Sequence, residues 1–298
     1  MTKRKVDRAT GRRGTKPSSR PVSLSDEPQA ANPLITLLTD FGTSDHFVAA
    51  MKGVILSIST HATIVDITHE IAPQDVAGAA FTLLAAYDSF PKGTIHVAVV
   101  DPGVGSSRRP ILGVAADHFL VGPDNGIFSY VFARERDVRV FHLDRAHYFR
   151  HPLSATFHGR DVFAPVAAAL ANGVQPGRLG SEISDPVRLP SSVPQLKGKG
   201  KIRGRVLHID RFGNCITNFT QHDLPANWRD RHFHLTVRRK VIRTVRRYFA
   251  EGNDHSEEPF AIWGSAGFLE IAALNRSAAE LLKVRRGQEV LLELQKQR

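Results

Sequence analysis

The stretch TIHVAVVDPGVGSSR, from Thr94 to Arg108, decides how the rest of this sequence is interpreted. Its segment 95–100 is nearly unbroken in apolar residues and rich in β-branched ones, which predicts a strand buried on both faces of a parallel sheet. Asp101 follows that strand directly, and ligands of open α/β sheets collect outside the carboxyl ends of the strands. A Pro-Gly turn then leads to Arg108. We expect an Asp101–Arg108 pair that either polarises a water molecule or is an ordinary surface ion pair.

The sequence before this stretch begins with another strand that ends at an acid. Residues 34–39 predict a buried strand, and Asp40 follows it. After a short turn, apolar residues recur at helical spacing over 47–58, with Ser44 or Asp45 as the expected helix cap. The pattern predicts a first strand–turn–helix unit with a carboxylate at its turn.

Strands and helices continue to alternate after this unit. A strand is predicted over 63–67, and a helix with Asp75 as its cap runs from about 73 to about 89. This alternation predicts an α/β fold, with an N-terminal, mostly parallel, three-layer α/β domain. The sequence contains neither GxGxxG nor GxxxxGK[ST], so we expect no dinucleotide or NTP site of those kinds.

Two later segments carry polar residues that could reach the same edge of the sheet. A strand over 118–122 leads into the turn PDNG, which contains Asn125. A helix is predicted over 162–171, and His158 stands just before it, beside a glycine, an arginine and an acid. A helix start stabilises anions and polarised groups, so His158 is a candidate site residue, with a purely structural histidine as the alternative.

The composition describes a globular chain without a membrane span. Its 298 residues are 42% hydrophobic, which is enough for two domains with filled cores. The apolar runs are shorter than the roughly 18 to 20 residues that cross a bilayer. Cys215 is the only cysteine, so an intrachain disulfide and a cluster of thiolate ligands are both excluded. We expect a cytoplasmic protein without a membrane partner.

The net charge of +11 is concentrated at the N-terminus. Residues 1–33 carry eight Lys or Arg and three Asp or Glu, so this segment holds 8 − 3 = 5 of the 11 charges. It has few large apolar residues and no apolar core of a secretory signal, which predicts a disordered basic tail over 1–33. We interpret the tail as a solubilising extension and expect no nucleic-acid partner; contact with RNA is the alternative.

The remaining sequence divides into a linker and a second domain. The N-terminal domain is predicted over 34–190, a Pro-, Ser- and Gly-rich linker over 191–201, and a small C-terminal β-barrel domain over 202–298. The C-terminal domain is predicted from short strands and one short helix. The strands are expected at 203–209, 232–237, 260–263, 268–273 and 289–294, and the helix at about 277–282.

Seven motifs occur in order along the chain: TDFG, VDITHEI, VVDPGVGSSRR, PDNG, TFHGRDVFAP, IDRFGN and GFLEIA. In this order and spacing they resemble the S-adenosylmethionine hydrolases, also called S-adenosylmethionine hydroxide adenosyltransferases, which are related to fluorinases and chlorinases. The resemblance runs from about Leu34 to Leu294 and excludes the basic tail. It implies a homotrimer whose active site lies between the N-terminal domain of one subunit and the C-terminal domain of its neighbour, and it implies no metal.

The resemblance also implies an activity and a set of site residues. The activity is hydrolysis of S-adenosyl-L-methionine to adenosine and L-methionine by attack of water at C5′, with no cofactor. The residues that activate water match Asp101, Arg108 and His158, and the carboxylate that binds the ribose hydroxyls matches Asp40. Six further positions match substrate-binding residues or shared motifs: Asp210 and Ser265 at the methionine end, Asn214 and Phe212 at the adenine, and Asn125 and Glu270 with less specific roles.

The chain departs from the halogenases at several of their positions. Asp101 stands where they have tyrosine, Gly159 where they have the halide-binding serine, and Gln74 where they have tryptophan; Ala266 and Ala273 replace two arginines. We therefore expect water as the nucleophile, with halogenase-like substitution as one alternative. A non-catalytic nucleoside-binding protein with an RNA-touching tail is the other, and it would have no use for the water-activating residues.

Overall fold

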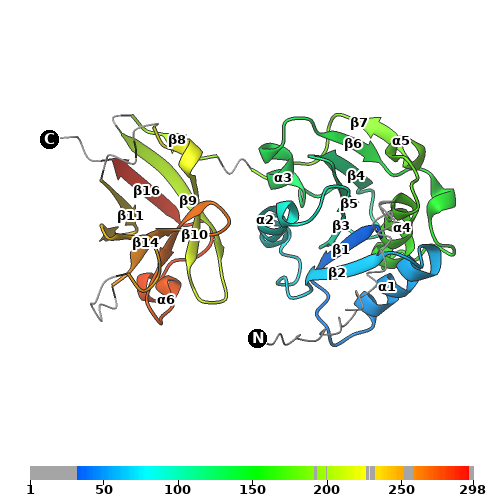
Figure 1. Ribbon diagram of the computed structural model, residues 1–298, viewed down its shortest axis with the longest axis horizontal. Coiled ribbons are helices and arrows are strands. Elements are labelled where there is room, and N and C mark those ends of the chain that lie inside the picture. Colours follow the sequence, from blue (N-terminus) through cyan, green and yellow to red (C-terminus); the bar gives the residue numbers. More distant parts are fainter. Residues whose placement is uncertain are drawn as a thin grey trace, which may run out of the picture. The chain divides into compact units, whose positions relative to one another are not determined.

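The computed structural model describes residues 32–190, 193–198, 200–225, 228, 232–251 and 258–294 (Figure 1). The tail predicted over 1–33 lies outside the described residues except for its last two positions. The described chain forms a seven-stranded sheet covered by helices, followed by a nine-stranded sheet. The predicted α/β class and the predicted order of the two domains are both confirmed.

The first sheet is parallel on one side and antiparallel on the other. Its strands are β1 (Leu34–Thr39), β2 (Thr63–Thr68), β3 (Ile95–Val99), β4 (Pro110–Ala115), β5 (His118–Pro123), β6 (Arg139–His142) and β7 (Ser181–Ile183), in the order β2-β1-β3-β5-β4-β6-β7. The pairs from β2 to β5 are parallel, and the pairs from β5 to β7 are antiparallel. Because β1 and β3 are parallel neighbours, the residues that follow them meet at one edge of the sheet.

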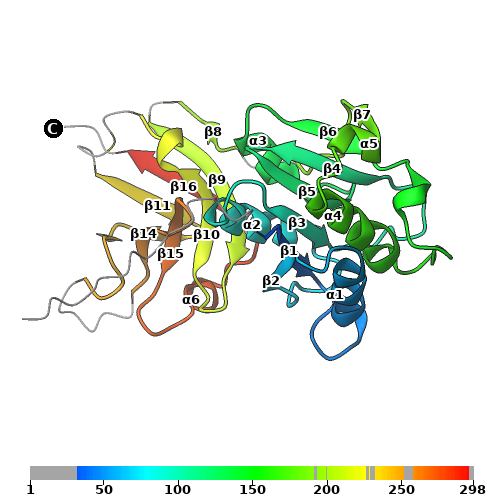
Figure 2. The ribbon, with the colours of Figure 1, turned by 45° about the vertical axis from the view of Figure 1, so that its right-hand side comes forward.

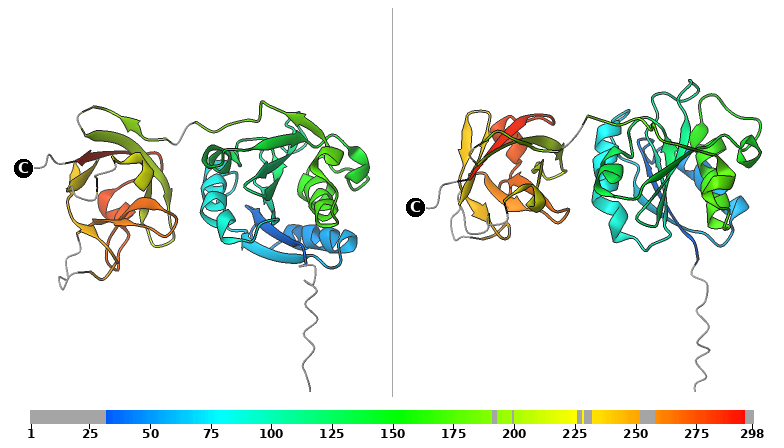
Figure 3. Two further views of the ribbon diagram at one scale, coloured as in Figure 1. Left: turned by 45° about the horizontal axis from the view of Figure 1, so that its top comes forward. Right: turned by 90° about the horizontal axis from the view of Figure 1, so that it is seen from above.

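Helices cover both faces of this sheet and make the three predicted layers. They are α1 (Phe47–Ile58), α2 (Val76–Ala86), α3 (Ser129–Arg134), α4 (Ala164–Ala171) and the short α5 (Pro176–Leu179). Figures 1 and 3 show α1 and α4 on one face and α2 on the other. Neighbouring residues of a strand therefore belong to different hydrophobic cores. Leu37 lies in the core between the sheet and helices α1 and α4, and Leu38 lies in the core between the sheet and helices α2 and α3. As predicted, residues 95–100 are buried throughout.

Two of the predicted helix starts differ in how they are fixed. Asp75 caps α2 as predicted, since its carboxylate accepts a hydrogen bond from the Gly78 backbone N–H at 2.9 Å. The predicted cap of α1 was wrong: the helix starts after His46, and no side chain among the described residues makes a capping hydrogen bond there. Aromatic packing fixes this end instead, because the Phe47 ring contacts the rings of Phe41 and Phe157, with centroids 5.6 and 5.2 Å apart.

Other helix boundaries also differ from the prediction. The helix expected to run to about residue 89 ends as α2 at Ala86 and continues as a 3₁₀ turn, Tyr87–Ser89. The helix expected over 162–171 begins with a π-helical turn, Gly159–Phe163, before α4. Such turns occur frequently at functional sites, and this one directly follows His158.

The second sheet curls into a barrel-like domain (Figure 2). Its elements are β8 (Gln195–Leu196), β9 (Lys201–Ile209), β10 (Cys215–Thr220), β11 (Phe233–Val237), β12 (Lys240–Ile242), β13 (Val245–Arg246), β14 (Phe260–Trp263), β15 (Phe268–Ala272), α6 (Ala278–Leu282) and β16 (Glu289–Leu294). All five predicted strands and the short helix are present, whereas β10, β12 and β13 were not predicted. β8 lies in the segment predicted as linker and pairs with β9. Among the described residues, no helix is long and apolar enough to cross a membrane.

Candidate active site

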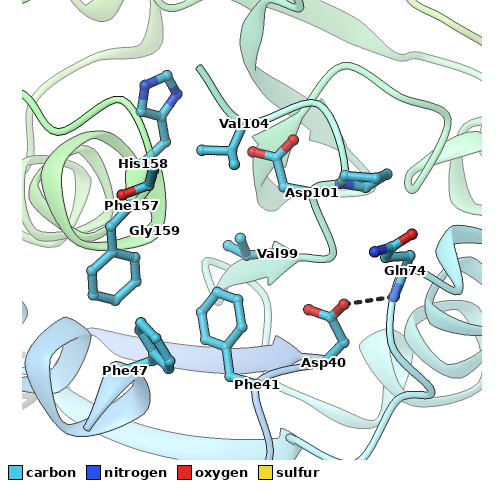
Figure 4. Close-up of a pocket in the computed structure, with 12 residues that line it drawn as sticks. Asp40, Phe41, Phe47, Gln74, Val99, Asp101, Val104, Phe157, His158 and Gly159 are labelled. Atoms are coloured by element: carbon cyan, nitrogen blue, oxygen red, sulfur yellow. Dashed lines mark hydrogen bonds between the residues drawn. The ribbon is translucent and has the colours of Figure 1, made fainter. Parts of the chain in front are cut away.

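A pocket of about 440 Å³ lies at the carboxyl ends of β1 and β3 (Figure 4). Its lining residues all come from the N-terminal domain. They are Asp40, Phe41, Phe47, Gln74, Val99, Asp101, Pro102, Val104, Thr156, Phe157, His158 and Gly159. The pocket thus brings together Asp40, Asp101 and His158, which the sequence placed after two strands and before a helix.

Asp101 and Arg108 form a bidentate pair inside the domain. The Arg108 Nε donates to both carboxylate oxygens, at 2.9 and 3.1 Å, and Nη2 donates to Oδ2. The Asp101 and Arg108 side chains are only 6% and 9% exposed, so the surface ion pair considered from the sequence is excluded. Arg108 does not line the pocket, and it acts on the pocket through the residues that it holds.

A glycine shapes the turn between these two residues. Gly105 has φ of +77°, and a Cβ built on it would lie 2.2 Å from the Ala155 carbonyl oxygen. Only glycine combines that backbone conformation with so close an approach. The turn after Asp101 therefore packs directly against the segment that carries His158.

His158 is held in one tautomer by Arg108. Its Nδ1 lies 2.8 Å from Arg108 Nη2. A guanidinium group can only donate, so Nδ1 is the acceptor and the neutral ring carries its proton on Nε2. Burial, together with the Arg108 charge, lowers the pKa of His158 below its usual value of 6.5. His158 therefore presents a neutral ring with an Nε2–H donor.

The loop before His158 is fixed by a buried carboxylate. Asp161 is completely buried and accepts hydrogen bonds from Arg150 at 3.2 Å, from Arg160 at 2.7 Å and from the Ser154 backbone N–H at 2.9 Å. These hydrogen bonds attach residues on both sides of His158 to the Asp161 carboxylate. They restrict where the imidazole can lie.

Asp40 is held at the end of β1 by contacts from two other segments. Its Oδ2 accepts a hydrogen bond of 2.8 Å from the Gln74 backbone N–H, drawn in Figure 4. His69 fixes the turn itself: its Nδ1 is 2.9 Å from the Thr39 hydroxyl oxygen, and its carbonyl accepts from the Gly42 N–H at 2.8 Å. The motif VDITHEI thus supports the loop that carries Asp40, a role the sequence did not reveal.

One part of the pocket wall is aromatic, and its residues were not predicted as site residues. Phe41, Phe47 and Phe157 pack on one another with centroids 5.2 to 5.9 Å apart. Phe41 belongs to TDFG and Phe157 to TFHG, so their places in those motifs were the available signal. Three carboxylate or imidazole groups therefore face an aromatic surface, as is usual for sites that bind small molecules.

Asn125, predicted to bind substrate, does not line this pocket. Its Nδ2 donates to the Val100 carbonyl at 2.8 Å, and its Oδ1 accepts from the Ile127 N–H at 3.2 Å. Both ends of the carboxamide are thus engaged by backbone groups, one directly after β3 and one just after the PDNG turn. In the described chain Asn125 fixes the PDNG turn against the strand that precedes Asp101.

The predicted residues of the C-terminal domain form a separate group in the described chain. Asp210 accepts hydrogen bonds from the backbone N–H groups of Phe212 and Asn214, at 2.9 and 2.8 Å, and from Asn214 Nδ2 at 2.8 Å. Asn214 is buried, while Phe212 is 78% exposed. None of Asp210, Phe212, Asn214, Ser265 and Glu270 lines the pocket that contains Asp101.

Glu270 is a buried acid of this group, and its pKa is raised. Burial raises its pKa to about 7, and the Asp210 charge adds to the rise. Its carboxylate lies over Gly264, where a Cβ would come within 1.7 Å of Oε1. Ser265 lies in the following turn, between β14 and β15. In the part of the chain that the structure describes, no group of three or more His, Cys, Asp or Glu residues is arranged to hold a metal ion.

Family models match both domains of the chain. The SAM hydroxide adenosyltransferase N-terminal domain matches residues 35–180, and the corresponding C-terminal domain matches 204–291. The chain belongs to the SAM hydroxide adenosyltransferase family. The resemblance seen in the seven motifs is therefore confirmed.

Individual members of the SAM hydroxide adenosyltransferase family and related proteins agree with this result. The (R)-S-adenosyl-L-methionine hydrolase of Methanocaldococcus jannaschii is 38% identical over 262 residues, which are 84% of this chain and 92% of that protein. A fluorinase of Actinoplanes sp. is 28% identical over 223 residues, 66% of this chain and 75% of the fluorinase. The crystal structure of a conserved protein from Thermotoga maritima matches with a TM-score of 0.79 and 35% identity, covering 87% of this chain and 99% of that one.

Proposed function

We propose that the protein hydrolyses S-adenosyl-L-methionine to adenosine and L-methionine. The observation that carries this proposal is the buried Asp101–Arg108 pair joined to His158 at the edge of the pocket. The family, and the hydrolase name of the relative from M. jannaschii, support the same reaction. A nucleoside-binding protein without activity would not need a buried charge pair beside a histidine of fixed tautomer.

In the proposed reaction, a water oxygen bonds to C5′ while the bond from C5′ to the sulfonium sulfur breaks. The electron pair of that bond goes to sulfur, which leaves as the neutral thioether of methionine. The water loses its proton to the Asp101 carboxylate and then to solvent. General-base catalysis of this kind contributes about 10²- to 10⁴-fold.

The two other residues prepare that step. The Nε2–H of His158 donates to the water oxygen and orients it, because Nδ1 is occupied by Arg108. Arg108 holds the Asp101 carboxylate in place through two parallel hydrogen bonds. As hydroxide character develops on the water beside a sulfonium cation, opposite charges cancel, and the apolar wall of Phe41, Phe47 and Phe157 favours that cancellation.

Asp40 is proposed to bind the ribose hydroxyls. The methionine and adenine ends would be held by Asp210, Phe212, Asn214, Ser265 and Glu270. Among the described residues, those that line the pocket all fall between positions 40 and 159, so these C-terminal residues would come from a second copy of the chain, as in a homotrimer. The reaction is proposed to need no metal or other cofactor and to take place in the cytoplasm.

The test of this proposal is the identity of the products. Purified protein incubated with S-adenosyl-L-methionine should release equal amounts of adenosine and methionine, resolved by liquid chromatography and mass spectrometry. Both sulfonium epimers should be supplied, because the name of the relative specifies (R). Release of S-adenosylhomocysteine, or of no nucleoside from either epimer, would contradict the proposal. Mixing inactive His158→Ala and Asp210→Ala subunits should restore activity if sites are shared between copies.

A further inference from the structure

Gln74 has a backbone conformation that its residue type disfavours. Its φ is +64°, in the left-handed region that glycine and asparagine adopt much more readily than glutamine. Residues kept in such conformations concentrate at ligand-binding and catalytic positions, where the surrounding structure holds them. Gln74 lines the pocket that contains Asp40 and Asp101.

The contacts of the Gln74 backbone do not explain why this residue is glutamine. Its N–H donates to Asp40 at 2.8 Å, and its carbonyl accepts from the Val76 N–H at 3.0 Å, just before α2. Glycine has the same N–H and carbonyl groups and adopts this φ without strain. The reason for glutamine must therefore lie in its side chain.

The Gln74 side chain is exposed and is free to meet a ligand. Among the residues that the structure describes, none forms a hydrogen bond with its carboxamide. Figure 4 shows the carboxamide on the side of the pocket where Asp40 and Asp101 lie, across from Phe47 and Phe157. A carboxamide both donates and accepts, whereas the neighbouring Asp40 carboxylate only accepts.

We propose that Gln74 is a substrate-binding residue that forms hydrogen bonds with the ribose diol together with Asp40. Two adjacent hydroxyl groups can each donate and accept, so a carboxylate and a carboxamide side by side satisfy them better than a carboxylate alone. This inference rests on the proposed function, because it assumes that the ribose lies at Asp40. The backbone link from Gln74 to Asp40 fixes the spacing of the two binding groups.

The test compares two substitutions of Gln74 in the full-length protein. Gln74→Met keeps the length of the side chain and the backbone strain but removes both hydrogen-bonding atoms, and Gln74→Gly removes the side chain and relieves the strain. Both variants should raise KM for S-adenosyl-L-methionine by about five- to tenfold, the loss expected for one or two neutral hydrogen bonds. The melting temperature of Gln74→Gly should equal or exceed that of the wild type.

Deoxy analogues and a matched control separate ligand binding from structure. The KM penalty of Gln74→Met should disappear with the 2′-deoxy or the 3′-deoxy form of the substrate, whichever lacks the hydroxyl that Gln74 binds. Lys283, at φ +51° after α6, is a second left-handed residue, and Lys283→Gly should leave KM unchanged. Equal penalties with all three substrates, an unchanged KM, or a lower melting temperature for Gln74→Gly would overturn the inference.

A binding measurement keeps this inference separate from the proposed reaction. Isothermal titration with adenosine and its 2′-deoxy and 3′-deoxy forms reports ribose recognition whether or not hydrolysis occurs. A wild-type protein that releases no adenosine from S-adenosyl-L-methionine contradicts the proposed function. Weaker binding of adenosine by Gln74→Met, with an unchanged affinity for one deoxy form, supports Gln74 as a diol-binding residue in either case.

Discussion

Replacing Arg108 by methionine should slow the reaction without weakening substrate binding. Arg108 does not line the pocket, but it donates to both oxygens of Asp101 and to Nδ1 of His158. Arg108→Met removes all of these bonds at once and leaves a carboxylate that is only 6% exposed without its partner. We expect kcat to fall about 10²- to 10⁴-fold, which is roughly 2.7 to 5.4 kcal/mol of activation free energy, while KM changes little.

The pH profile of the same variant gives an independent readout. The Arg108 charge is the second cause, after burial, of the lowered pKa of His158. Without the Arg108 charge the pKa of His158 should rise, so its ring becomes protonated at a higher pH than in the wild type. The acid limb of the kcat profile should then move to higher pH.

Arg108→Lys is the matched control for this experiment, because it keeps a positive charge near Asp101 but cannot form the two parallel hydrogen bonds of a planar guanidinium group. Its kcat should lie between those of the wild type and Arg108→Met. Steady-state kinetics from pH 5 to 9, with circular dichroism to check folding, measures both effects. A kcat within threefold of the wild type, or a loss carried entirely by KM, would refute the assigned role of Arg108.

Changes at Asp40 and His96, and the addition of halide ions, should each give a distinct measurable result. Asp40→Ala should raise KM about 10- to 100-fold with little change in kcat, since a carboxylate hydrogen bond is worth about 1.5 to 3 kcal/mol; a fall in kcat alone would contradict a binding role. His96 is buried, and burial together with the nearby His118 lowers its pKa to about 3. Because His96 in the unfolded chain takes up a proton below about pH 6.5, the free energy of unfolding should fall by at most about 5 kcal/mol between pH 6.5 and 3. Urea titrations of His96→Asn should show a smaller dependence of the unfolding free energy on pH. With chloride or fluoride at high concentration no 5′-halo-5′-deoxyadenosine should form, because the Asp101 carboxylate repels an anion and Gly159 offers no hydroxyl to hold it. A halonucleoside formed as fast as adenosine would show that halide can act as the nucleophile.

The strands that position the site could be predicted because their apolar sequences indicate burial. Residues 34–39 and 95–100 are apolar on both faces, and the structure buries them between two helix layers. The pairing of Asp101 with Arg108 was predictable since only a short glycine turn separates them. Such local patterns carry enough information to place a carboxylate at a strand end.

Strand β10 was missed because its polar residues hide the strand pattern. Thr217 and Asn218 lie in its middle, yet both are buried. The Thr217 hydroxyl donates to the Leu269 carbonyl at 2.6 Å, and the Asn218 side chain accepts from the Arg205 N–H at 2.6 Å. Their partners are distant in sequence, so nothing local indicates that these polar groups are satisfied.

The supporting contacts of the site were unpredictable for a similar reason. His69 reaches Thr39 across 30 positions, and Gln74 reaches Asp40 across 34. Gln74 also adopts a φ that its residue type does not suggest. Motif positions identified which residues matter, but only the folded chain shows which of them hold the others.

The origin of the oxygen atom in the product shows whether water attacks C5′. The reaction should be run in ¹⁸O-labelled water with S-adenosyl-L-methionine, and the adenosine analysed by fragment mass spectrometry. Attack of water held by Asp101 and His158 at C5′ predicts one ¹⁸O atom in the 5′ hydroxyl of adenosine and none in methionine. Unlabelled adenosine, or label at any other position of either product, would contradict this account.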